Sequence, residues 1–150
     1  MEWLGQLGFA LPLGLGAIGS ALGIGAAGRA AAGAWAKEAK AGKGMNFLYL
    51  ALTGMPLSQT IYAFVMMLVI LKPGIYGDVV AEHPGALFSI GLACGLGEML
   101  SAWMQGVIGA AGIRAMSESD GKPFTNTLIA MGIAETVGLF AFVFMFLMMP

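Results

Sequence analysis

The stretch Met55-Pro-Leu-Ser-Gln-Thr-Ile-Tyr-Ala-Phe64 recurs 76 residues later as Met131-Gly-Ile-Ala-Glu-Thr-Val-Gly-Leu-Phe140. The two stretches share Met, Thr and Phe at matching positions, and Gln59 of the first corresponds to Glu135 of the second. Each lies within an apolar run that is long enough to cross a lipid bilayer. The chain is therefore a duplication in which one copy carries an acid and the other carries an amide.

The composition is that of an integral membrane protein. Hydrophobic residues make up 59% of the chain and charged residues 10%, whereas about a quarter of the residues of a soluble protein are charged. A spanning helix needs about 20 apolar residues, and spanning segments must satisfy their own backbone hydrogen bonds. Because the apolar runs are continuous rather than alternating, we expect helices. The predicted helices cover residues 5–32, 46–71, 85–114 and 125–149.

A second repeat relates the odd-numbered helices, since Gly25-Ala-Ala-Gly28 returns as Gly109-Ala-Ala-Gly112. We therefore expect an all-α membrane protein with a single membrane domain over residues 1–150, built from two tandem parallel hairpins over 1–72 and 85–150. The hairpins share one orientation because an even number of crossings separates them. This arrangement differs from the inverted repeats of many secondary transporters.

The basic residues indicate how the chain is oriented. Lys72 alone marks the second connection, whereas the first and third connections hold or adjoin the other six: Arg29, Lys37, Lys40, Lys43, Arg114 and Lys122. Cytoplasmic loops carry an excess of Lys and Arg. We predict a multi-pass protein of the cell membrane, with both hairpin loops in the cytoplasm and both termini outside.

Small residues crowd the first and third helices. Gly19 with Gly23, and Gly91 with Gly95, stand four residues apart, a spacing that lets helix backbones approach closely. The second and fourth helices end in bulky apolar runs over residues 64–71 and 140–149. Slim helices inside and bulky ones outside describe the wall of a ring, although glycine is also frequent in membrane helices in general.

Polar residues gather on one face of the second helix. Met55, Ser58, Gln59 and Tyr62 fall at i, i+3, i+4 and i+7, positions that are neighbours on a helix surface. Pro56 lies within the same helix and removes a backbone donor, so we expect a bend there that leaves nearby carbonyl oxygens free to bind a cation. Ser58 and Tyr62 are also consistent with ordinary interhelical hydrogen bonding and packing.

Glu135 predicts an ion site in the middle of the membrane. Its predicted depth matches that of Gln105 in the third helix, and Gln59 is level with both within a few residues. A carboxylate at the centre of a membrane helix is costly, and no basic residue lies in any helix core to pair with it. One carboxylate, two amide oxygens and a hydroxyl are hard donors that favour Na+. Gln and Tyr side chains can equally hydrogen-bond a protonated Glu135, which leaves H+ as the alternative.

These residues carry a family resemblance that covers the whole chain. The chain resembles the proteolipid (c or K) subunit of V-type and related rotary ATPases in its duplicated four-helix form. More narrowly, it is similar to the Na+-translocating bacterial members. Three segments carry the resemblance: Pro56-Leu-Ser-Gln-Thr-Ile-Tyr62, Gln105-Gly-Val-Ile-Gly-Ala-Ala-Gly112 and Ala134-Glu-Thr136.

The resemblance implies a ligand set. It consists of the carboxylate of Glu135, the side chains of Ser58, Gln59 and Gln105, and the backbone carbonyl of Met55, with Tyr62 bonding the carboxylate. Ser58 stands where the family pattern has Thr, a difference that keeps the hydroxyl.

The resemblance also implies partners and a function. Identical copies would form a rotor ring in the membrane lipid. A soluble ATPase head would turn the ring through central stalk subunits. The ring would carry Na+ or H+ past a stator a-type subunit with an essential arginine. The chain itself would have no catalytic residues, and the net charge of -1 gives no indication of nucleic acid binding.

Glu98 departs from the family pattern. It precedes Gln105 by seven residues and so lies about 10 Å farther along much the same helix face. Three interpretations remain open: a second ion site, a protonated acid bonded to a neighbour, or a carboxylate that reaches water in the lumen of the ring. We favour a structural or lumenal role, since an acid without a ligand set is more easily kept neutral.

An alternative function is a self-contained oligomeric channel or pore, with Glu135 and Glu98 lining water. It predicts that the isolated protein conducts ions, whereas a rotor ring conducts nothing without its stator.

Overall fold

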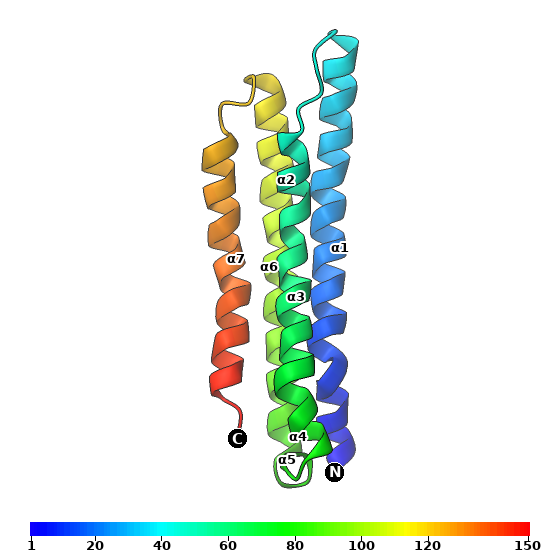
Figure 1. Ribbon diagram of the computed structural model, residues 1–150, viewed down its shortest axis with the longest axis vertical. Coiled ribbons are helices and arrows are strands. Elements are labelled where there is room, and N and C mark those ends of the chain that lie inside the picture. The colour runs from blue at the N-terminus through cyan, green and yellow to red at the C-terminus, as the bar shows by residue number, and fades with distance from the viewer.

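Four helical columns make up the chain, and a computed structural model describes all of residues 1–150. The columns are long and apolar enough to span a membrane (Figure 1), and no strand is present. The elements are α1 (Glu2–Lys40), a second column of α2 (Leu48–Gly54), η1 (Met55–Leu57), α3 (Ser58–Val65), η2 (Met66–Leu71) and α4 (Lys72–Tyr76), then α5 (Val79–Glu82), α6 (Pro84–Glu118) and α7 (Phe124–Leu147). The predicted all-α membrane fold is confirmed.

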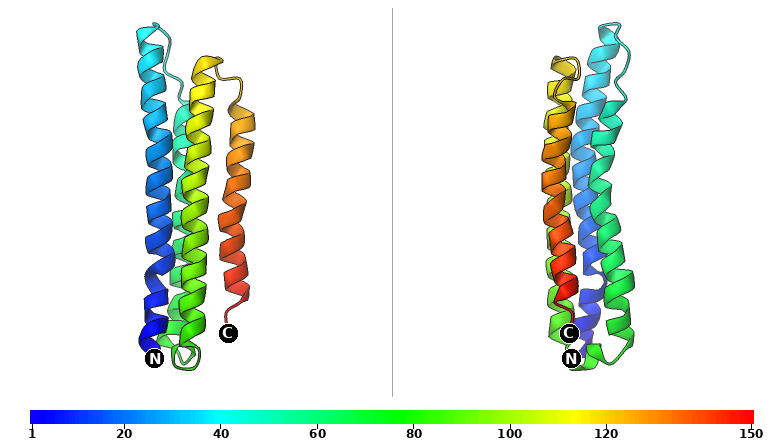
Figure 2. Two further views of the ribbon diagram at one scale, coloured as in Figure 1. Left: turned by 180° about the vertical axis from the view of Figure 1, so that it is seen from behind. Right: turned by 60° about the vertical axis from the view of Figure 1, so that its left-hand side comes forward.

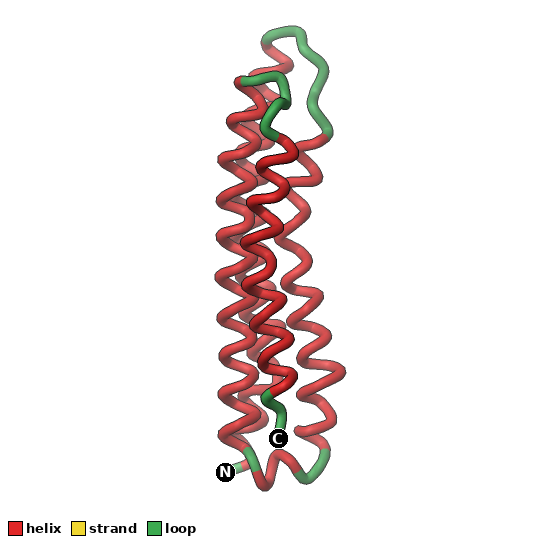
Figure 3. The backbone as a smooth tube through the Cα atoms, turned by 90° about the vertical axis from the view of Figure 1, so that its left-hand side faces the viewer, coloured by secondary structure: helices red, strands yellow, loops and turns green.

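The two hairpins run in the same direction. Both chain termini and the connection through α5 lie at one end of the bundle, and the two hairpin loops lie together at the other end, here called the loop end (Figure 3). The loops span residues 41–47 and 119–123. This arrangement confirms the two tandem parallel hairpins.

The helix ends differ from the predicted ones mainly at the loop end. α1 continues to Lys40 rather than ending at residue 32, and α6 continues to Glu118 rather than ending at 114. The prediction ended each helix where apolar residues give way to charges. The alanine-rich stretch after residue 29 favours helix in water as well as in lipid, so the helix outlasts the apolar run. The second column ends at Tyr76 instead of 71, and the short α5 was not predicted.

The closest packing joins α1 to α6. Seen from behind, these two helices stand side by side in front of the second column, with α7 beside α6 (Figure 2). A Cβ added to Gly91 would overlap the backbone of Gly8, and one added to Gly106 would overlap the backbone of Gly23. The small residues thus serve a backbone contact within one chain, as their four-residue spacing predicts.

The bulky residues of the second column and of α7, the fourth column, face outward. α7 is the least buried of the four spanning helices, and it exposes Ile133, Val137, Phe140 and Phe144. The faces of α1 and α6 that point away from their contact also carry large apolar groups, among them Trp103. Apolar surface of this extent is expected to contact lipid or neighbouring copies.

Polar contacts tie the loop end together. Lys43 Nζ lies 2.9 Å from Asp120 Oδ1 and so links the two hairpin loops. The hydrogen bond from Lys43 lowers the pKa of the Asp120 carboxyl, and the same bond raises the pKa of Lys43. Both groups are exposed, so the pair adds little to stability. Nearby, the buried Glu38 accepts hydrogen bonds from the Tyr49 hydroxyl and the Asn46 amide.

Replacing Gly106 by alanine should separate α1 from α6. The added methyl would overlap the backbone of Gly23, and overpacking of this kind costs about 1–3 kcal/mol. We expect the purified protein to unfold at a lower temperature in detergent. Gly14→Ala is the matched control, because its Cβ meets nothing within 4 Å. Equal unfolding temperatures for the two variants would contradict the close backbone contact.

Candidate ion-binding site

Polar side chains from α3, α6 and α7 meet inside the bundle. Gln59 Nε2 donates to Gln105 Oε1 at 3.2 Å, and Gln105 Nε2 donates to Glu135 Oε2 at 3.3 Å and to the Met131 carbonyl at 3.2 Å. Tyr62 donates its hydroxyl to Glu135 Oε1 at 2.9 Å. Each carboxylate oxygen of Glu135 therefore accepts one hydrogen bond. The predicted common depth of Gln59, Gln105 and Glu135 is confirmed.

The start of α3 brings further oxygen atoms to the same place. Ser58 Oγ lies 3.0 Å from the Met55 carbonyl oxygen and 3.1 Å from Gln59 Oε1. Proline removes a backbone N–H, and the chain around Pro56 tightens into the 3-10 turn η1 before α3 begins. The site thus holds Ser58, Gln59 and the Met55 carbonyl at the α3 start.

In this structure the carbonyl oxygens of Met55 and Pro56 both accept hydroxyl hydrogen bonds. The Met55 carbonyl accepts the Ser58 hydroxyl, and the Pro56 carbonyl accepts the Ser20 hydroxyl from α1. Thr60 donates to Ser20 Oγ in turn, at 2.7 Å. Buried carbonyl groups require partners, and hydroxyl side chains supply them here.

Ser101 belongs to the site, although the sequence analysis did not single it out. Its hydroxyl donates to the Ala134 carbonyl at 2.8 Å, so its oxygen accepts from Gln59 Nε2 at 3.1 Å. This pair of bonds directs the Gln59 nitrogen toward α6 and the Gln59 oxygen toward Ser58. Ser101 could have been identified from its position four residues before Gln105, because residues four apart lie on one face of a helix.

The charge of Glu135 has no basic partner in the chain. The ion pair of Lys43 with Asp120 and the contact of His83 with Glu82 both lie outside the spanning segments. Gln59 and Gln105 are completely buried, whereas Glu135, Ser58 and Tyr62 are partly buried. An ionised carboxylate in an apolar setting is strongly unfavourable unless a cation or proton neutralises it.

Glu98 lies in the interior rather than on an exposed face. It is completely buried, and neither carboxyl oxygen has a hydrogen-bond partner. The lumenal interpretation and that of an acid bonded to a neighbour are therefore both wrong. The α6 face that carries Ser101 and Gln105 points inward, and Glu98 lies on that face. The channel alternative consequently loses one of its two water-lining acids.

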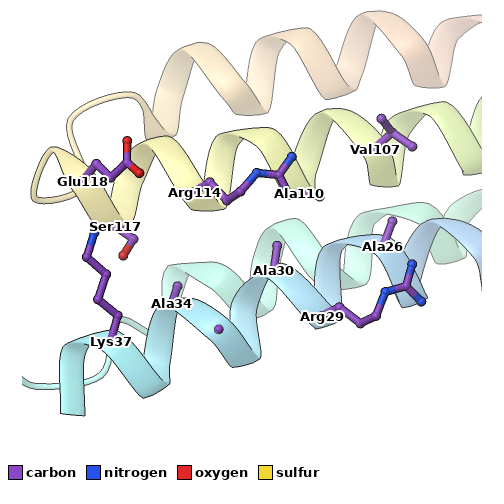
Figure 4. Close-up of a pocket in the computed structure, with 11 residues that line it drawn as sticks. Ala26, Arg29, Ala30, Ala34, Lys37, Val107, Ala110, Arg114, Ser117 and Glu118 are labelled. Carbon is purple, nitrogen blue, oxygen red and sulfur yellow. The ribbon is translucent and has the colours of Figure 1, made fainter. Parts of the chain in front are cut away.

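Basic residues of α1 and α6 line a separate cavity. It has a volume of about 580 Å³ and lies between α1 and α6 at the loop end (Figure 4). Arg29, Lys37 and Arg114 line it together with Glu118. Neither arginine takes part in the hydrogen bonds around Glu135.

Comparison with known families gives the same duplication. The sequence profile of the ATP synthase C-subunit family matches the chain twice, over residues 7–70 and 88–148. The chain belongs to this family. A search of curated proteins found no match to it. As a family member it is an ion-translocating proteolipid that catalyses no reaction itself, and it works in a ring of identical copies with an a subunit and a stalk.

Removing the Tyr62 hydroxyl should weaken ion binding. Tyr62→Phe deletes one of the two hydrogen bonds that hold the Glu135 side chain, and hydrogen bonds to charged groups contribute about 1.5–3 kcal/mol. We expect the ion concentration for half-maximal transport to rise about tenfold to a hundredfold in the ATP-driven complex. Tyr76→Phe is the control, since Tyr76 is exposed and donates no hydrogen bond. Identical behaviour of both variants would remove Tyr62 from the site.

Proposed function

We propose that this chain is the rotor-ring proteolipid of a V-type ATPase, that it carries Na+, and that Glu135 binds the ion. One observation carries the proposal: a membrane carboxylate without a basic partner is joined by hydrogen bonds to two buried amides and a tyrosine hydroxyl. Such an acid is a site for an ion or a proton by default.

The donor set favours Na+ over H+. The ligands we propose are oxygens of the Glu135 carboxylate, the side chains of Ser58, Gln59 and Gln105, and the Met55 carbonyl. All are hard donors of the type that hard cations prefer. Both side chains that hydrogen-bond Glu135 act as donors to it, which suits an ionised carboxylate. The cation would replace the hydrogen bond from Gln105 to Glu135, because amide oxygens bind cations and amide N–H groups do not.

Charge neutrality would govern the rotation. Glu135 is partly buried on α7, the most lipid-exposed helix, so it could enter the lipid only after an ion cancels its charge. An arginine of the stator a subunit would displace the ion where the ring meets the stator. Arg29 and Arg114 cannot serve this purpose, because they line the cavity at the loop end.

The amide at position 59 favours a pump over a synthase. Gln59 stands where a second acid would complete the duplication, so four helices carry one ion instead of two. For a fixed number of helices this lowers the number of ions moved per ATP. We expect the purified complex in vesicles to take up Na+ when ATP is supplied. Net ATP synthesis under ordinary ion gradients would contradict the pump assignment.

We also propose the orientation of the ring. The loop end holds the basic residues Arg29, Lys37, Lys43 and Arg114, and positive residues favour the cytoplasmic side. The two hairpin loops would then face the stalk in the cytoplasm, and both termini would lie outside the cell membrane.

Carbodiimide labelling tests both the ion and its ligand. These reagents modify protonated carboxyl groups in apolar settings. We expect Glu135 to be labelled in the complex, and millimolar Na+ to protect it at neutral pH. Glu135→Gln should abolish the labelling at position 135 and the ATP-driven transport, whereas Glu118→Gln, at the exposed end of α6, should change neither. Labelling that is indifferent to Na+ would assign the chain to H+ instead.

A further inference from the structure

Glu98 is a buried acid that the proposed ion site does not use. It is 0% exposed, and both of its carboxyl oxygens are without a hydrogen-bond partner. Glycine on α7 makes room for it, because a Cβ added to Gly138 would overlap Glu98 Oε2 and the Ser101 hydroxyl. On the α1 side, Gly16 packs against Ala63 and the Glu98 side chain.

No positive charge reaches Glu98 from any neighbouring helix. The ionisable groups nearest to it are Glu135 on α7, Tyr62 on α3 and Cys94 on α6 itself, and none of them supplies a cation. α1 has no ionisable residue between Glu2 and Arg29. On α6 the first basic residue is Arg114, about 24 Å along the helix at 1.5 Å per residue. A carboxylate in this setting would bear a large desolvation cost without any compensation.

The position of Glu98 matters for the charge of Glu135. Gly138, which contacts the Glu98 carboxyl, follows Glu135 by three residues, about one turn of α7. If both acids were ionised, a protomer with one Na+ would still carry a negative charge into the lipid. One cation and one proton make the protomer neutral.

We propose that Glu98 is a second proton-binding site of the protomer, and that it keeps its proton while Glu135 exchanges its ion. This inference rests on the proposed function of Glu135. The ligand is a proton rather than a second metal ion, because no cluster of three or more His, Cys, Asp or Glu side chains surrounds Glu98 and neither of its carboxyl oxygens has a hydrogen-bond partner. The bound proton makes Glu135 the sole charge that Na+ has to cancel.

Infrared spectroscopy of the purified complex detects the proton directly. In the Glu135→Gln variant we expect the band of a protonated carboxyl group at neutral pH, well above the ordinary glutamate pKa of about 4.3. Adding Glu98→Gln should remove this band. Glu38→Gln is the matched control and should leave the band in place, because Glu38, the other buried acid, accepts two hydrogen bonds.

Absence of the band in Glu135→Gln, or its survival in the double variant, would overturn the proposal. The band of the Glu135→Gln variant alone decides the matter if the double variant fails to assemble. The band does not depend on which ion the ring carries. Transport that continues in Glu135→Gln would overturn the proposed function and leave the spectroscopic result intact.

The Na+ affinity of Glu98→Gln provides a second measurement. Gln matches a protonated Glu in size and charge, so we expect the Na+ concentration that half-protects Glu135 from carbodiimide to be unchanged at neutral pH. At alkaline pH the wild type should bind Na+ more tightly than Glu98→Gln, because loss of the Glu98 proton adds a negative charge near Glu135. Coupling between sites commonly amounts to about 5-fold to 150-fold. Weaker binding in Glu98→Gln at neutral pH, or parallel pH curves, would contradict the linkage.

Discussion

The requirement that no bare charge enters the lipid governs this structure. Glu135 is a carboxylate on the most exposed spanning helix, without a basic partner in its own chain. A mobile cation or proton would neutralise it, and in the proposed function this ion binding is the condition under which α7 faces lipid. The amides of Gln59 and Gln105 and the hydroxyl of Tyr62 hold this carboxylate in one place. A carboxyl group that is costly to place in a membrane is thereby held in a defined position.

The glycine contacts between α1 and α6 determine where this site forms. Because Gly91 lies against Gly8 and Gly106 against Gly23, α6 sits deep in the bundle and contacts α1, α3 and α7. Its polar face therefore points inward, and both Gln105 and Ser101 form hydrogen bonds with α3 and α7. The same geometry buries Glu98, which shares that face. The contact between α1 and α6 thus accounts for the positions of both the proposed ion site and the unpartnered acid beside it.

The sequence predicted the four columns and the depth of the site because helix rise and apolar length are local properties. Gln59, Gln105 and Glu135 could be placed level with one another by counting residues from predicted ends. Ser101 and Ser20 escaped notice because their partners, Ala134 and Pro56, are distant in sequence. The surroundings of Glu98 were wrongly predicted because its spacing from Gln105 places both residues on one face of α6 but does not show that Gly16 of α1 and Gly138 of α7 pack against Glu98. α1 was predicted too short because an apolar run marks the membrane and not the helix.

Equilibrium binding of radioactive Na+ to the purified complex would show whether each chain binds one cation at Glu135. We expect saturable binding of one Na+ per chain, lost in Glu135→Gln and retained in Glu118→Gln. Binding that survives in Glu135→Gln would place the ion elsewhere, and a complex that binds no Na+ at all would contradict the sodium assignment.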